Sequence, residues 1–214
     1  MKSLNQYIKE KLIINKDYHD AMIVVKSFDE LRNIIVDRYI KLGPGTEQKP
    51  IDFNDIDVSN LDSFCNKEYT GIFEETKFKY IDISDWNVSN VKSMRGMFFM
   101  CKELESVGDI SEWDVSKVIN MSFMFSECKK FNQYLSDWDV SNVTDMNGMF
   151  KFCISFNQDL SNWDVSSVKD MSFMFYWCKS FKQDISNWNV SNVTDMTYMF
   201  LNCPIKDEYK PKFK

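Results

Sequence analysis

Cysteine is the most reactive residue type of this chain, and five of its six copies recur at a nearly constant spacing. They are Cys101, Cys128, Cys153, Cys178 and Cys203, at intervals of 27, 25, 25 and 25 residues. If copies of a repeat lie one over the next, about 4.8 Å apart, neighbouring cysteines come within the distance that a disulfide tolerates. Free cysteine is also among the most buried residue types, and the chain shows no secretion signal, so we predict a column of buried thiols in a reducing compartment.

Metal binding and catalysis receive little support from the other reactive residues. Zinc sites need ligands that converge at short spacing, whereas these cysteines lie 25 residues apart and the one histidine, His19, falls outside their pattern. No nucleophile elbow, phosphate-cradling loop or H-E-x-x-H motif occurs among only six glycines. We therefore predict a protein that is not an enzyme, with no catalytic residues, no metal and no cofactor.

Acidic and amide side chains form further columns. These are Asp114, Asp139 and Asp164; Asp145, Asp170 and Asp195; and Gln133, Gln158 and Gln183. Stacked carboxylates attract hard cations, but short polar side chains at corners usually bond nearby backbone. Asn87 and Asn189 replace the acid of the first column, which such a turn tolerates better than a calcium site would. We predict structural roles for all three columns.

Large apolar side chains occupy positions that vary from one copy of the repeat to the next. They are Phe99, Met100, Phe123, Phe152, Phe173, Tyr176, Trp177 and Tyr198. Fixed positions are needed for stacking, so specificity normally resides at the variable ones, and aromatic residues are typical of interface hot spots. The alternative is that these rings lie over neighbouring copies, because Gly96 and Gly148 alternate with Phe123 and Phe173.

A repeat of 25 residues places all of these side chains. Its most regular markers are the cysteines and the tryptophans Trp86, Trp113, Trp138, Trp163 and Trp188. The unit reads W-[DN]-V-S-x-V-x-x-M-x-x-M-F-x-x-C-x-x-F-x-Q-x-[LI]-S, and the 27-residue step is a two-residue insertion near residues 106–108. A degenerate copy begins near Asp57. Since 25 residues cannot bury their own apolar side chains, the copies must stack as a solenoid.

Each copy, or rung, is expected to contain one short strand and one short helix or 3-10 turn. Val143, Met146, Met149, Phe150 and Cys153 follow steps of 3, 3, 1 and 3, the spacing of one helical face, and Ser141 is a candidate N-cap. Residues 156–161 alternate apolar and polar side chains, which predicts a strand that pairs in parallel with its neighbours. The predicted fold is an α/β repeat solenoid.

The repeat unit resembles that of the BspA-like leucine-rich-repeat family of bacterial surface proteins and mycoplasma lipoproteins, over about residues 51–204. The resemblance implies a leucine-rich-repeat-like solenoid that binds other proteins. Surface members of that family carry signal peptides, lipobox cysteines or sorting tails, which this chain lacks. Its organisation, a short leader followed by a few repeats, is similar to that of family members encoded by bacteriophages and gut bacteria.

Three regions are expected. Residues 1–50 predict a helix-strand-helix cap, with a helix over 3–12, a strand over 21–25 and a second helix that starts at a Ser27-x-x-Glu30 capping box. Leu31, Ile34, Ile35 and Ile40 form the apolar face of that helix, and residues 43–45 end it. Residues 51–204 are one degenerate and five good repeats, the last truncated. Residues 205–214 form a basic tail that either folds back over the last rung or stays loose.

Charge narrows the class of partner. Residues 1–50 and the last eleven residues each carry +2 of a total of −6, so residues 51–203 carry −10, which argues against nucleic acid. No stretch is apolar enough to enter a membrane. We predict a cytoplasmic or virion-associated, non-catalytic protein-binding module. The alternative is a structural or assembly component, of a phage or a surface array, that forms homo-oligomers.

Overall fold

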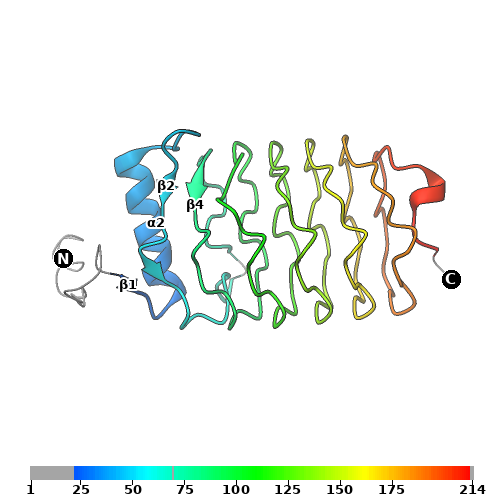
Figure 1. Cartoon of the computed structure of the whole chain (residues 1–214), viewed down its shortest axis with the longest axis horizontal. Helices are drawn as coiled ribbons and strands as arrows, with labels where there is room; N and C mark the ends of the chain where they lie inside the picture. Colours follow the sequence, from blue (N-terminus) through cyan, green and yellow to red (C-terminus); the bar gives the residue numbers. More distant parts are fainter. Residues whose placement is uncertain (1–21, 69, 213–214) are drawn as a thin grey trace.

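The computed structural model describes residues 22–68 and 70–212, in which the chain winds repeatedly around one axis (Figure 1). The elements are β1 (Ile23–Val24), α2 (Phe28–Leu42), β2 (Ile51–Asp52), β3 (Ile56–Asp57), β4 (Ile81–Asp82) and the 3-10 helix η1 (Asp207–Tyr209). Strand β1 lies within the predicted strand at 21–25. The helix predicted over 3–12 lies outside the described residues. No helix among those described has the length and apolar character that crossing a bilayer requires.

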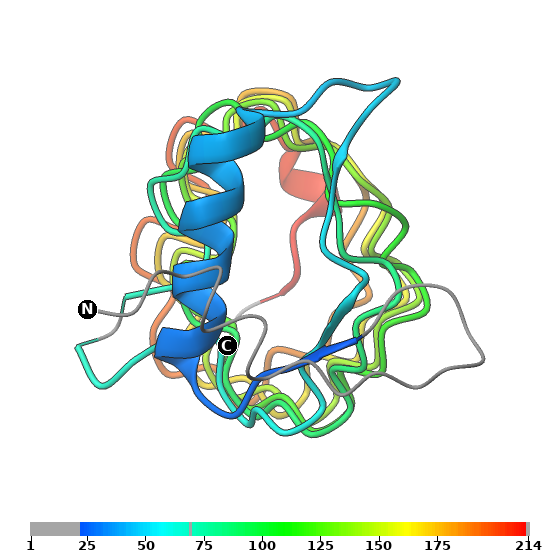
Figure 2. The same ribbon diagram turned by 90° about the vertical axis from the view of Figure 1, so that its left-hand side faces the viewer.

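Helix α2 lies across the N-terminal end of the stack of rungs (Figure 2). The predicted helix N-cap at Ser27 is confirmed, because the Ser27 hydroxyl accepts from the Glu30 N–H at 3.2 Å. The Glu30 carboxylate in turn accepts from the Lys26 N–H at 2.8 Å. At the other end, the Gly43 N–H donates to the Tyr39 carbonyl with Gly43 at φ 76°. These contacts set the length of the helix at both termini.

The apolar face of α2 differs from the prediction at one residue. Leu31, Ile34 and Ile35 are buried against the first rungs, but Ile40 is 75% exposed. Five residues beyond Ile35, at about 100° per residue, place Ile40 well away from the buried stripe. Including Ile40 in the apolar face was therefore wrong.

Two short parallel pairs attach the N-terminal segment to the stack. Strand β1 pairs with β3 in the register Ile23 to Ile56, and β2 pairs with β4 in the register Ile51 to Ile81. In later rungs the parallel bridges are isolated and join Asn120, Asp145, Asp170 and Asp195 in succession. The repeat register is thus maintained at 25 residues along the stack.

Tight turns occupy the part of each rung where a short helix or 3-10 turn was expected. The Met124 N–H donates to the Met121 carbonyl and the Cys128 N–H to the Phe125 carbonyl, so two i to i+3 turns follow each other. Steps of three are common to a helical face and to such turns, which is why the spacing did not distinguish them. The Ser141 N–H donates to the Asp139 side chain rather than opening a helix, and residues 156–161 form no strand.

A ladder of backbone hydrogen bonds joins these turns from rung to rung. Every second N–H donates to the following rung, from Met121 to Asp145, Phe123 to Asn147, Phe125 to Met149 and Glu127 to Lys151, at 2.7–3.0 Å. The intervening N–H groups of Met124 and Ser126 close turns within their own rung. Along this face all ladder N–H groups therefore point toward the C-terminal end and all ladder carbonyls toward the N-terminal end.

Columns of identical side chains fill the interior. Phe125 stacks on Phe150 at 5.9 Å and Phe150 on Phe175 at 5.7 Å, while Trp163 stacks on Trp188 at 6.4 Å. Most tryptophans donate their indole N–H to a carbonyl of the preceding rung: Trp86 to Phe53, Trp138 to Ile110, Trp163 to Leu135 and Trp188 to Leu160. The indole of Trp113 has no such partner among the described residues, and the two-residue insertion near residues 106–108 lies just before it in the chain.

The tail folds back over the last rung, the first of its two predicted arrangements. Ile205 is 5% exposed, and the Ile185 N–H donates to the Tyr209 carbonyl at 3.0 Å. The Lys210 ammonium lies 5.7 Å from the centre of the Phe200 ring. These contacts cover part of the last rung and leave residues 195–202 at the open edge.

Candidate functional site

The eight residues predicted as a contact surface all lie on the paired turns of the rungs. Six of them have left-handed backbones: Met100, Phe123, Phe152, Phe173, Trp177 and Tyr198, with φ between 55° and 59°. Gly96 and Gly148 occupy the same column as Phe123, with φ 59° and 58°. The second left-handed column, which contains Met100, also holds Glu127 and Asn202.

This backbone conformation is unfavourable for large side chains. It costs a residue other than glycine about 1–2 kcal/mol, and asparagine tolerates it better than most. The turns demand it at these positions whichever side chain they carry, as Gly96 and Gly148 indicate. Large apolar residues at strained positions must therefore contribute through packing or through binding, and strained backbone of this kind clusters at functional sites.

Five of the predicted residues form one cluster, which we call the aromatic ridge. Its members are Phe152, Phe173, Tyr176, Trp177 and Tyr198. Ring centres are 5.3 Å apart between Phe152 and Tyr176, 6.0 Å between Phe152 and Trp177, 5.7 Å between Phe173 and Tyr176, and 5.5 Å between Phe173 and Tyr198. Trp177 is 36% and Tyr198 57% exposed, and the other three are half-buried. The ridge crosses three successive rungs.

Two lysines lie over the ridge. The Lys151 ammonium is 5.4 Å from the centre of the Phe173 ring, 5.8 Å from Phe152 and 5.9 Å from Tyr176. The Lys179 ammonium is 4.1 Å from the centre of Trp177. Such contacts are worth about 0.5–1 kcal/mol at exposed sites. They hold the rings in place and show that this face accommodates cationic groups.

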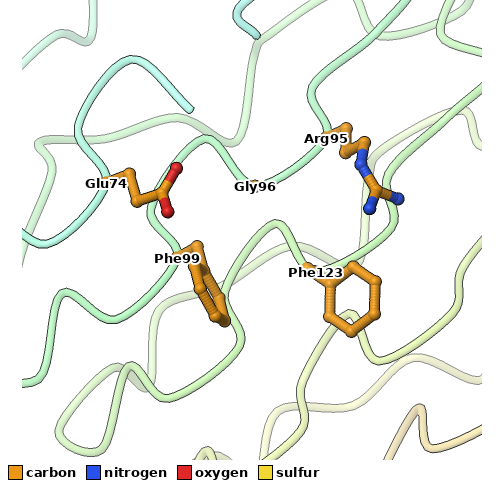
Figure 3. Close-up of a pocket in the computed structure, with 5 residues that line it drawn as sticks. All are labelled: Glu74, Arg95, Gly96, Phe99 and Phe123. Carbon is orange, nitrogen blue, oxygen red and sulfur yellow. The ribbon is translucent and has the colours of Figure 1, made fainter. Parts of the chain in front are cut away.

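Phe99 and Phe123 lie apart from the ridge and line a separate cavity of about 190 Å³, which we call the Gly96 hollow (Figure 3). Their ring centres are 6.3 Å apart in an edge-to-face arrangement. Glu74 and Arg95 stand on opposite sides, with Gly96 between them (Figure 3). The structure therefore divides the predicted surface into two sites, and Met100 has no ring to contribute to either.

Hydrogen bonds hold both charged groups of the hollow. The Arg95 guanidinium donates to the Ser122 hydroxyl at 2.6 Å and lies 5.1 Å from the centre of the Phe123 ring. The Glu74 carboxylate accepts from the Gly71 N–H at 2.8 Å. Neither residue was predicted from the sequence, although one signal was available: Arg95 stands where the next three rungs have Ser122, Asn147 and Ser172.

Packing between rungs also uses these aromatics, as the alternative interpretation proposed. A Cβ added to Gly148 would come within 2.7 Å of the Phe123 ring, so Phe123 lies directly over that glycine. The ring of Phe123 is nevertheless half-buried and still lines the hollow. Packing and an accessible surface thus coexist at this residue.

The acidic columns cap local turns. Asp114 accepts from the hydroxyl and the N–H of Ser116, and Asp164 accepts from the N–H of Ser166. Hydrogen bonding to the side chains and then to the backbones of these serines lowers the pKa of both carboxyl groups. Burial raises the pKa of Asp145, whose carboxylate accepts from the Asn147 N–H and the Asn120 amide. Among the described residues, no cluster of three His, Cys, Asp or Glu side chains is arranged to hold a metal ion.

The glutamines and cysteines bond the backbone of the preceding rung. Gln133 donates to the Gly108 carbonyl, Gln158 to Asn132 and Gln183 to Asn157, at 2.8–3.0 Å. The thiols donate likewise: Cys128 to Phe98, Cys153 to Phe125 and Cys178 to Phe150, at 2.8–3.0 Å. Burial raises the pKa of these three thiols well above the usual value, so they stay protonated at neutral pH and are poor nucleophiles.

Comparison with known protein families gives a match over the repeats. Residues 47–109 and 102–210 match a family described as Mycoplasma protein of unknown function, DUF285. The two stretches together span most of the chain and coincide with the repeats. No curated protein and no solved structure matches.

Proposed function

Because the chain belongs to the family described as Mycoplasma protein of unknown function, DUF285, a name that specifies no activity, we propose a function from its geometry: a non-catalytic module that binds another protein through the aromatic ridge. The observation that carries the proposal is the ridge itself. Four of its five rings sit on left-handed residues, which belong to two columns, and these columns hold Gly148 one rung before Phe173 and Asn202 one rung after Trp177.

The ridge has the composition of an interface centre. Aromatic residues are enriched among hot spots, where truncation to alanine costs about 2 kcal/mol or more. The most exposed members, Trp177 and Tyr198, carry an N–H and an O–H that stay available to a partner's acceptors. The net charge of −6 favours a positively charged partner through long-range steering.

The ends of the stack argue against pairing between two copies. At the N-terminal end, Arg32 of α2 donates to the Ile72 carbonyl at 2.6 Å and the Glu74 carbonyl at 3.0 Å, which occupies the acceptors of the first rung. At the C-terminal end, the ladder ends at Met196, Tyr198, Phe200 and Asn202, whose N–H groups have no acceptor among the described residues. At these four positions, two such ends brought together would oppose donors with donors. This geometry favours a binder of foreign proteins over a self-associating component.

The fold assignment is part of the same proposal. We regard the stack as a solenoid of the BspA-like leucine-rich-repeat type, a class used for protein recognition. The repeat register of 25 residues and the parallel bridges between successive rungs support that assignment. The absence of an internal strand in most rungs is the feature that separates this chain from a regular leucine-rich repeat.

A matched pair of variants tests the proposal. The immobilised chain, its Phe152→Ala/Trp177→Ala variant and a Tyr134→Ala control are exposed to the same lysate, and captured proteins are quantified by mass spectrometry. Tyr134 is 49% exposed and lies outside the ridge. We expect at least one protein to be retained by the wild type and the control and reduced more than tenfold by the ridge variant, at similar melting temperatures. Equal capture by all three would refute the proposal.

A further inference from the structure

We propose that the rings of Phe152, Phe173 and Tyr176, which we call the ring cage, hold an arginine side chain of the partner protein in exchange for Lys151. The inference rests on the proposed function, because the cage is part of the aromatic ridge, and it names the partner's anchor. In the free chain the Lys151 ammonium lies 5.4–5.9 Å from all three ring centres. The partner's guanidinium takes over these contacts, and the Lys151 side chain turns into solvent.

The walls of the cage face in different directions. The Tyr176 ring meets the Phe152 ring at 88° and the Phe173 ring at 69°, with ring centres 5.3 and 5.7 Å apart. In the interior, by contrast, Phe150 and Phe175 stack at 12°. Rings set at angles surround one point, and a cation at that point is attracted by all three ring quadrupoles at once.

Backbone hydrogen bonds hold the three rings in position relative to one another. The Phe152 N–H donates to the Tyr176 carbonyl of the next rung at 2.8 Å, and the Tyr176 N–H donates to the Phe173 carbonyl at 3.0 Å. All three side chains are half-buried. Because the cage is formed before a partner arrives, binding costs it little conformational entropy.

The Lys151 ammonium is held by the rings and by no charged partner. In the part of the chain that the structure describes, neither Lys151 nor Lys179 forms an ion pair, and the Lys151 ammonium forms no hydrogen bond. Cation–π contacts at exposed rings favour the bound position of a lysine by a factor of only about 2–5, against a side chain with high rotamer entropy. Lys151 therefore gives way to a cation that binds the rings more strongly.

Arginine is the cation that improves on Lys151. Its guanidinium is planar and more weakly hydrated than an ammonium, so it stacks on aromatic faces at a lower cost in hydration. In this chain Arg38 and Arg95 each lie 5.1 Å from the centre of a phenylalanine ring, closer than Lys151 lies to any ring of the cage. A partner's lysine would only offer the group that is already present, and the net charge of −6 favours a basic partner over an acidic one.

Matched small probes test the cage. The ¹⁵N-labelled chain is titrated with N-acetyl-arginine methylamide, and separately with the lysine and citrulline analogues, at constant ionic strength and up to about 50 mM, well above a millimolar dissociation constant. Citrulline has the shape of arginine without its charge. We expect saturable shifts of the Phe152, Phe173 and Tyr176 amide signals with the arginine probe, and binding at least about threefold weaker with the other two. Equal binding of the arginine and citrulline probes would overturn the proposal.

An acidic probe tests the opposite choice of partner. N-acetyl-aspartate methylamide is titrated in the same way, because Lys151 and Lys179 could also bind a carboxylate. We expect no saturable shifts of the cage signals. Tighter binding of this probe than of the arginine probe would mean that the two lysines anchor an acidic partner, and it would overturn the exchange.

Two lysine variants with the same change in net charge locate the effect. Lys151→Ala removes the competing ammonium and should tighten binding of the arginine probe about threefold or more, because the cage is then free in every molecule. Lys129→Ala, at an exposed lysine outside the cage, is the control and leaves the affinity unchanged. Tyr176→Leu in the Lys151→Ala background removes one wall and should weaken the probe about threefold. An affinity that Lys151→Ala lowers or leaves unchanged would overturn the exchange.

The capture experiment separates failure of the cage from failure of the proposed function. If the Phe152→Ala/Trp177→Ala variant loses its captured protein but the arginine probe binds no better than the citrulline probe, the cage is wrong and the ridge stands. If the probe binds and Lys151→Ala also increases capture of the same protein, an arginine of that partner occupies the cage. Capture that Lys151→Ala leaves unaffected, although the probe binds, would overturn the role of the cage in partner binding.

Discussion

At the N-terminal end of the stack a helix covers the first rung, whereas at the C-terminal end the last rung keeps much of its surface in water. Leu31 and Ile35 of α2 are 0% exposed, and Arg32 satisfies the two leading carbonyls of the ladder. At the opposite edge Met196 is 43% exposed, although Met171, one rung earlier, is 0% exposed. The same consensus residue is thus core or surface according to whether another layer follows it.

The comparison shows what a rung needs from its neighbour. Each rung needs apolar side chains from its neighbour that cover its own apolar side chains. Along the ladder it also needs donors for its carbonyls and acceptors for its N–H groups. Helix α2 supplies both at the N-terminal end, while the folded-back tail supplies mainly apolar cover around Ile205 at the other. Stability is therefore expected to be concentrated toward the helix end.

The largest expected effect is the loss of apolar cover at the helix. Leu31→Ala should destabilise the chain by about 2–5 kcal/mol, because it opens a cavity at a fully buried position. Leu201→Ala, at a position 44% exposed on the last rung, should change stability by no more than about 0.5 kcal/mol. Denaturant unfolding followed by tryptophan fluorescence measures both. Similar losses for the two variants would show that the ends are equivalent.

The second largest effect concerns the hydrogen bonds that Arg32 of the same helix donates to the first rung. Arg32→Met leaves the Ile72 and Glu74 carbonyls without their donor and should cost about 1–3 kcal/mol. Burial lowers the pKa of Arg32, but the guanidinium stays charged at neutral pH. Lys210→Met is the matched control at the other end, where Lys210 pairs with the fully exposed Asp207, and should cost less than about 0.5 kcal/mol. An Arg32→Met variant as stable as its control would contradict this role.

Thiol accessibility should also differ between the centre and the last rung. Burial raises the pKa of Cys203 to about 11, and this thiol is half-buried, whereas Cys128, Cys153 and Cys178 are fully buried. In a Cys65→Ala background, a thiol reagent at pH 8 should label Cys203 at least about tenfold faster than the three central thiols. Because the thiolate reacts, labelling of Cys203 should accelerate about tenfold per pH unit below pH 11. Equal rates at all positions would indicate that the stack opens as a whole.

The smallest effect tests backbone strain at the open edge. Tyr198 is 57% exposed with φ 55°, so Tyr198→Asn should stabilise the chain by about 0.5 kcal/mol through a better fit to the left-handed conformation. Phe123→Asn, at the equivalent position inside the stack, loses the ring over Gly148 and should destabilise it. Thermal unfolding compares the two. Stabilisation by both would mean that Phe123 contributes no packing.

Several features could be predicted from the sequence because they depend on neighbouring residues. The capping box at Ser27 and Glu30 and the Asx turns at Asp114 and Asp164 are local hydrogen bonds, and the 25-residue period is visible in the spacing of identical residues. The eight candidate surface residues were proposed from the sequence, but their division into a ridge and a hollow was not. Glu74 and Arg95 were missed because the hollow is lined by residues from three different rungs.

The sequence by itself determined the repeat, its register and which side chains recur, since these are properties of spacing and composition. Only the tertiary structure decided that steps of three make paired turns rather than a helix, because both conformations present the same apolar face. It alone placed Arg32 against carbonyls 40 and 42 residues away and brought Gly71 against the backbone of Gly96. These outcomes depend on how closely one rung approaches the next, and that distance is set by packing through space rather than by neighbours along the chain.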